Sequence, residues 1–169
     1  MFQRILVAVG GSPVAGAALW QAVDLALGER ARLTLVATLP RLPAVAYLAP
    51  VTPVGELADA RAACEKGLRQ AVGRVPDELP VTTLLVEGPA HRALVREVRR
   101  GGYDLLVVGS STRRRLPAAL GGDLGAALVR RCAIPVLVVR SPALEAGVAG
   151  PQPATVTALG IPGRRHARA

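Results

Sequence analysis

Short apolar runs alternate with longer segments of helical periodicity along the first 140 residues of the chain. The runs are built mostly from Val, Leu and Ile, and the first and last of them are continuous. Continuous apolar runs are typical of parallel strands that are buried on both faces. Five strands are therefore predicted, at residues 4–9, 32–38, 80–87, 103–110 and 134–139.

Helices are predicted between these strands. The first follows the Ser12-Pro13 pair, which suits a helix cap and a first turn, and its apolar stripe includes Leu19 and Leu27. The other helices are expected over about residues 54–74, from residue 88 onward and over about residues 122–131.

Repeated strand–helix–strand units define an α/β fold. We expect a five-stranded, mostly parallel sheet with right-handed crossovers and helices on both faces, a Rossmann-like arrangement. This domain is expected to span residues 1–141. Residues 142–169 are rich in Pro, Gly, Ala and Arg without sustained periodicity, so a poorly ordered tail is expected there. Ligands of such sheets bind beyond the carboxyl ends of the strands, where the strand order reverses. The candidate site is therefore the pair of turns at residues 10–12 and 109–122.

The segments "RILVAVGGS", "LTLVAT", "VEGPAHRALVREVRRGGYDLLVVGSS" and "IPVLVV" resemble, in order and spacing, the universal stress protein domain. The resemblance covers residues 2–140 and implies an adenine-nucleotide α-hydrolase-like fold. It also implies a possible ATP site, because several members bind ATP through a loop of the form G-x2-G-x9-G-(S/T). Members that bind ATP also tend to carry an aspartate at the end of the first strand, where it contacts the nucleoside.

On this chain the four loop positions fall on Gly109, Thr112, Gly122 and Asp123, and the aspartate position falls on Gly10. The spacing is retained, but the residues at Gly10, Thr112 and Asp123 depart from the pattern of the members that bind ATP. The candidate nucleotide-contacting residues are Ala8, Gly10, Thr38, Gly109, Thr112, Arg113, Gly122, Asp123 and Leu124.

The departures in the loop weaken phosphate binding for physical reasons. Thr112 has a branched Cβ, which resists the positive φ and the close backbone approach that glycine permits. The Asp123 carboxylate cannot donate a hydrogen bond to a phosphate, and it repels the anion by about 4 kcal/mol at ~4 Å and an effective dielectric constant of ~20, before screening. The sequence therefore favours a closed phosphate loop.

Other roles are open for the charged residues of this loop. An aspartate before a helix suits a cap, because it accepts free backbone N–H groups and matches the positive end of the helix dipole. Alternatively, Asp123 holds a metal that bridges to a nucleotide, or faces away from the ligand. Arg113, Arg114 and Arg115 either bind phosphate oxygens and offset Asp123, or form a solvated loop.

The net charge of +9 lies mostly in the second half of the chain, where residues 96–169 carry twelve arginines and four acidic residues. Such an excess attracts nucleic acid or phosphorylated ligands. Nucleic-acid binding is nevertheless not favoured, because aromatic residues are scarce and no zinc-finger or basic-zipper spacing occurs. No apolar run approaches the ~20 residues that span a bilayer, so no membrane segment is expected. Cys64 and Cys132 suggest buried thiols without a disulfide framework, which favours a cytoplasmic location.

Catalytic chemistry has little support in the sequence. His91 and His166 lack metal-ligating partners at suitable spacing, and no serine has an apparent His or Lys partner, so neither a metal site nor an enzyme is expected. Asp104 and Glu87 flank predicted strands and are expected to cap or orient loops.

The functional prediction is a stress-response binding and regulatory module of the universal stress protein kind, with weak or lost ATP binding. The alternative is a functional ATP or adenine-nucleotide sensor that uses the arginine-rich loop, and a slow nucleotide hydrolase is the third possibility. A homodimer is expected through the last strand, because an apolar edge strand invites pairing and the resemblance implies the same contact. That strand contains Pro135, Val136, Leu137, Val138 and Val139.

Overall fold

The structure is a computed structural model that describes residues 1–10, 13–39, 54–109, 124–140 and 155–160. Within these residues, the strands are β1 (Arg4–Ala8), β2 (Arg32–Leu39), β3 (Val81–Glu87), β4 (Leu105–Gly109), β5 (Val136–Arg140) and β6 (Thr155–Gly160). The helices are α1 (Pro13–Glu29), α2 (Val54–Val72), α3 (Ala90–Gly101) and α4 (Leu124–Val129). Each lies within two or three residues of its predicted bounds, apart from β6, which the sequence did not predict.

The strands form one sheet in the order β3-β2-β1-β4-β5-β6. β1 to β5 all pair in parallel, which confirms the predicted five-stranded parallel sheet. From β1 the chain builds outward through β2 and β3, and then returns to place β4 and β5 on the other side of β1. The strand order therefore reverses between β1 and β4, as the candidate site requires.

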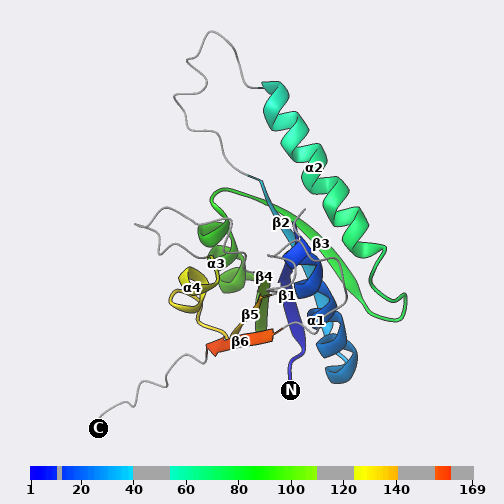
Figure 1. Ribbon diagram of the computed structural model, residues 1–169, viewed down its shortest axis with the longest axis vertical. Coiled ribbons are helices and arrows are strands. Elements are labelled where there is room, and N and C mark those ends of the chain that lie inside the picture. Colours follow the sequence, from blue (N-terminus) through cyan, green and yellow to red (C-terminus); the bar gives the residue numbers. More distant parts are fainter. Residues whose placement is uncertain (11–12, 40–53, 110–123, 141–154, 161–169) are drawn as a thin grey trace.

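Helices cover both faces of the sheet, as predicted (Figure 1). Side chains of a strand alternate between its faces, and β1 shows this clearly. Ile5 and Val7 pack into a core with α1 and α2, whereas Leu6 packs into a second core with α3 and α4. All three side chains are fully buried, so each face of the sheet has its own apolar layer.

One side of α1 differs from the prediction. Leu19 is buried against the sheet, whereas Leu27 is 41% exposed and does not belong to the apolar stripe. The buried positions include Ala22, Val23 and Ala26, which lie on the same side as Leu19 because an α-helix turns every 3.6 residues. Leu27 instead shares its side of the helix with the half-exposed Trp20, seven residues earlier.

The tail contributes a strand to the sheet. Residues 155–160 form β6, which pairs with β5 in antiparallel orientation, so this part of the predicted tail has regular structure. The run "TVTALG" is rich in β-branched residues, but the surrounding Pro, Gly and Ala hide this signal in the sequence. β5 is therefore not an edge strand, and the prediction that it is one is wrong. The other residues of the tail lie outside the described part of the chain.

Asp104 ties the amino ends of β1 and β4 together. Its Oδ2 atom accepts hydrogen bonds from the backbone N–H groups of Gln3, at 2.8 Å, and Arg4, at 2.9 Å. Its own N–H donates to the Arg4 carbonyl at 2.9 Å. The Arg4 guanidinium in turn lies 5.3 Å from the centre of the Tyr103 ring. Asp104 thus orients the segment before β4, as predicted.

Asp104→Ala is expected to lower the free energy of unfolding by about 1–3 kcal/mol, because two backbone donors lose a charged acceptor. Urea unfolding followed by the fluorescence of Trp20, the single tryptophan, measures the change. Asp59→Ala is the matched control, since Asp59 is exposed on α2. Equal stability of the Asp104 and Asp59 variants would show that the Asp104 hydrogen bonds do not stabilise the fold.

Candidate functional site

The carboxyl ends of β1, β2 and β4 meet at one edge of the sheet. β1 lies between β2 and β4, with Val7 opposite Leu35 on one side and Val107 on the other. Four of the predicted site residues are brought to this edge by the strands themselves. They are Ala8, Gly10, Thr38 and Gly109. The structure therefore places these four where a ligand of a doubly wound sheet binds.

Gly10 has room for a side chain. It is exposed and follows the Val9 N–H group, which donates to the Val36 carbonyl at 2.9 Å and continues the pairing of β1 with β2. A Cβ atom built on Gly10 meets no described atom within 4 Å, and its backbone is not in the left-handed region. An aspartate would therefore fit at this position. The described residues show neither a packing contact nor a backbone conformation that requires glycine here.

Thr38 occupies the neighbouring position on β2. Its carbonyl accepts a hydrogen bond from the Cys64 thiol of α2, with 3.8 Å between Sγ and the oxygen. This weak hydrogen bond links the middle of α2 to the end of β2. Cys64 is half-buried rather than buried as predicted.

The loop with the remaining motif positions is outside the described residues. Thr112, Arg113, Gly122 and Asp123 all belong to it, so their predicted roles stay predictions. α4 begins at Leu124, which makes Asp123 the residue immediately before the first helical residue. This position in the sequence is the one a helix cap occupies.

Leu124 and Gly125 attach α4 to the sheet. Leu124 is half-buried and packs against the core formed by α3, α4 and the sheet, so its side chain is part of the packing. A Cβ atom on Gly125 would lie 2.7 and 3.0 Å from the two γ-carbons of Val138. Glycine is therefore needed for the close approach of α4 to β5, a role that the sequence did not reveal.

The pKa of the Cys132 thiol bears on whether this group can act as a nucleophile. Burial raises the pKa of the Cys132 thiol to about 11, so the nucleophilic thiolate is disfavoured at neutral pH. No three His, Cys, Asp or Glu side chains gather as metal ligands among the residues that the structure describes. In the same part of the chain, no helix combines the length and the apolarity that a membrane span requires.

Comparisons with known proteins agree with this architecture. The model of the universal stress protein family matches residues 1–140. A universal stress protein from Burkholderia pseudomallei has 25% sequence identity and a TM-score of 0.66, over 82% of this chain and 96% of its own. UspA from Lactobacillus plantarum has 23% identity and a TM-score of 0.65, over 80% of this chain and 96% of its own.

A third solved structure, a universal stress protein in complex with cAMP, has 21% identity and a TM-score of 0.55, over 82% of this chain and 97% of its own. No curated protein matches the sequence. The family model covers all five parallel strands and the helices between them. The chain therefore belongs to the universal stress protein family.

Proposed function

We propose that the chain is a binding and regulatory module of the stress response and not an enzyme. Its adenine-nucleotide site binds ATP weakly or has lost ATP binding. The observation that carries the proposal is the set of residues at three motif positions, Gly10, Thr112 and Asp123. Each differs from the residue that ATP-binding members tend to carry at that position. The supporting geometry is the sheet edge at which Gly10 lies.

The loss at Gly10 is chemical rather than steric. An aspartate here would offer two acceptor oxygens to the hydroxyl groups of a nucleoside. Gly10 offers none from a side chain, although the described residues leave space for one. A nucleoside at this edge therefore lacks a charge-assisted hydrogen bond, which is worth about 1.5–3 kcal/mol.

The Asp123 carboxylate opposes a triphosphate in two ways. It is an anion placed just before α4, where a phosphate would take the free backbone N–H groups of the first turn. It can accept those same N–H groups itself and so stand in for the phosphate. Charge and competition for donors then act together, and Thr112 adds a branched side chain where a glycine would let the backbone approach.

A working adenine-nucleotide sensor is the second candidate. The solved structure in complex with cAMP supports it, since a protein of this fold is in complex with an adenine nucleotide. A single phosphate suffers less repulsion from Asp123 than a triphosphate does. The arginines at residues 113–115 would supply the cations in this case.

Thermal melting with nucleotide separates the two candidates. A ligand at 100 times its Kd stabilises the native state by about 2.7 kcal/mol, which raises the Tm of a chain of this size by roughly 5–10 °C. We expect 1 mM ATP with magnesium to move the Tm by less than about 1 °C. A rise of several degrees with ATP would overturn the proposal of weak or lost binding, and a rise with cAMP alone would favour the sensor.

We also propose that the chain forms a homodimer through residues 135–139 when β6 leaves β5. The backbone of β5 pairs with a strand on each side. At Leu137, Val107 of β4 lies opposite on one side and Leu159 of β6 lies opposite on the other. Two copies can join their β5 strands only after β6 has been displaced, since one strand edge holds one partner. The tail would then control the assembly of the module.

A cytoplasmic location is part of the same proposal. Cys64 packs with the core of α1 and α2, and Cys132 with the core of α3 and α4. The two free thiols thus lie on opposite faces of the sheet, where they cannot form a disulfide with each other. Free thiols are typical of a reducing compartment.

A further inference from the structure

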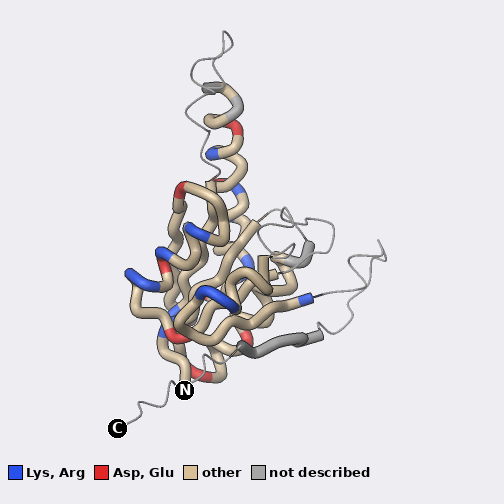
Figure 2. The backbone as a smooth tube through the Cα atoms, turned by 90° about the vertical axis from the view of Figure 1, so that its left-hand side faces the viewer, with Lys and Arg blue, Asp and Glu red and all other residues tan. Residues whose placement is uncertain are grey.

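A cavity of about 330 Å³ lies along the outer side of α3. Among the described residues, five arginines line it together with His91 and Val95. The arginines are Arg92, Arg96, Arg99, Arg100 and Arg131. Of the candidate nucleotide-contacting residues that the structure describes, which are Ala8, Gly10, Thr38, Gly109 and Leu124, none lines the cavity. Figure 2 looks onto the side of the molecule that carries α3 and α4 and shows several Lys and Arg positions along the backbone there.

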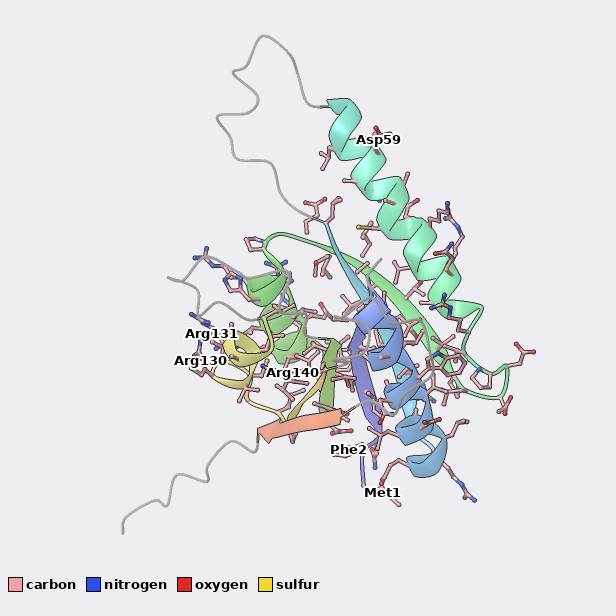
Figure 3. The ribbon with its side chains drawn as sticks, in the orientation of Figure 1. Met1, Phe2, Asp59, Arg130, Arg131 and Arg140 are labelled. Carbon is pink, nitrogen blue, oxygen red and sulfur yellow. The ribbon has the colours of Figure 1, made fainter. Side chains whose placement is uncertain are left out.

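The spacing of the arginines along α3 produces the basic face. Arg92, Arg96 and Arg100 are four residues apart, so they lie one above the other on the helix. Leu94 and Val98 take the opposite side and are buried against the sheet. Arg131 is added from the residues after α4, and Figure 3 shows it beside Arg130 at the end of that helix, close to α3.

The positive charges in this cavity are not neutralised by the described carboxylates. The Arg96 guanidinium donates a hydrogen bond to the Glu87 backbone carbonyl at 2.9 Å. The Arg131 guanidinium donates to the Ala127 backbone carbonyl at 3.4 Å. Both acceptors are uncharged. Among the described residues, the ion pairs involve Glu29 and Glu65, and neither pairs with a lining arginine. No ion pair with a described carboxylate therefore offsets the charges of the lining arginines.

Helix stability accounts for part of this basic face only. Arg99 and Arg100 are in the last turn of α3, where cations interact favourably with the helix dipole. Arg92 is in the first turn, where a cation is unfavourable and where α3 has no acidic residue. Arg92 thus adds charge to the cavity at a cost to the helix.

His91 forms the buried end of the cavity, with 4% of its surface exposed. Its pKa is lowered by burial, and further by the charges of Arg131 and Arg92. The imidazole is therefore held neutral among cations. An anion bound to the arginines would remove part of this repulsion and raise the His91 pKa, which makes His91 a reporter for the cavity.

We propose that this cavity binds a compact polyphosphate group, the di- or triphosphate part of a small organic molecule. Guanidinium groups match phosphate oxygens in charge and in bidentate geometry. No Trp, Tyr or Phe of the described chain lines the cavity, so recognition rests on the phosphates rather than on stacking against such a ring. The volume is at the low end for a ligand site and suits a short phosphate chain.

Titration of the full chain with inorganic tripolyphosphate in low-salt buffer tests the proposal. The chain has two histidines, so NMR spectra contain two imidazole Hε1 signals, which His166→Gln assigns. We expect saturable binding by calorimetry and a shift of the His91 signal with an upward change in its pKa. The His166 signal serves as the internal control.

Matched variants locate the binding. Arg92→Gln with Arg99→Gln removes two exposed charges from α3, and we expect a Kd at least about tenfold higher, as the loss of charged hydrogen bonds predicts. Lys66→Gln with Arg69→Gln removes two exposed charges from α2 and should change the Kd by less than about threefold. Equal effects of the two pairs would overturn the proposal, because the binding would then follow net charge alone.

The size of the ligand is tested with two larger anions. Duplex DNA of increasing length and vesicles containing anionic lipid are titrated under the same conditions. Affinity for DNA that rises with length and exceeds that for tripolyphosphate would overturn the proposal in favour of a nucleic-acid surface. Vesicle binding that the α3 variant abolishes would overturn it in favour of a membrane surface. An unmoved His91 signal with tripolyphosphate would also contradict it.

Discussion

The chain truncated after Pro142 is expected to form a homodimer at micromolar concentration, where the full-length chain stays monomeric. The truncation removes β6, which pairs with β5 from Val136↔Gly160 to Arg140↔Thr155. β5 then becomes an apolar edge strand with a row of unpaired backbone groups, which a second copy can satisfy. Light scattering with size-exclusion chromatography measures the change in mass.

Truncation after Gly160 is the matched control, because it shortens the tail but keeps β6. We expect this chain to remain monomeric. If both truncated chains are monomers, β5 does not join subunits; if both are dimers, β6 does not control the assembly. A charge at Leu137 is a poor alternative probe, because its side chain is 5% exposed in the core beneath α1 and a buried lysine would destabilise the monomer itself.

The parallel sheet was predictable because its strands are buried on both faces. Ile5, Leu6 and Val7 are consecutive and all fully buried, so the sequence of β1 is apolar without interruption. β6 has no such uninterrupted run, and its β-branched residues are hidden among the Pro, Gly and Ala of the tail. Leu27 was misplaced for a related reason: a broad apolar helix such as α1 does not show in the sequence which side faces the sheet.

The position of the candidate site was predictable, but much of its surroundings was not. Parallel topology alone brings Gly10 and Gly109 to one edge. The contact of Gly125 with Val138 joins segments far apart in the sequence, so no local pattern indicates it. The basic face of α3 follows from the spacing of Arg92, Arg96 and Arg100, whereas the addition of Arg131 depends on how α3 and α4 pack.

A variant that restores the nucleotide signature, Gly10→Asp with Thr112→Gly and Asp123→Ser, is expected to bind ATP at least about 100-fold more tightly than the natural chain. Removal of the Asp123 charge ends a repulsion of up to about 4 kcal/mol before screening. The new aspartate adds an acceptor for the nucleoside, worth about 1.5–3 kcal/mol. Serine retains the ability to cap α4, so the change at Asp123 should cost no more than a few tenths of a kcal/mol in stability.

Calorimetric titration with ATP and magnesium of the natural chain, Asp123→Ser and the triple variant tests the loss of ATP binding most directly. Asp59→Ser is the control, because it removes the same charge from an exposed position of α2. We expect little or no heat of binding from the natural chain and from the control, a measurable affinity for Asp123→Ser and a higher one for the triple variant. Low-micromolar binding by the natural chain that Asp123→Ser weakens would contradict the account, since Asp123 would then belong to a working site.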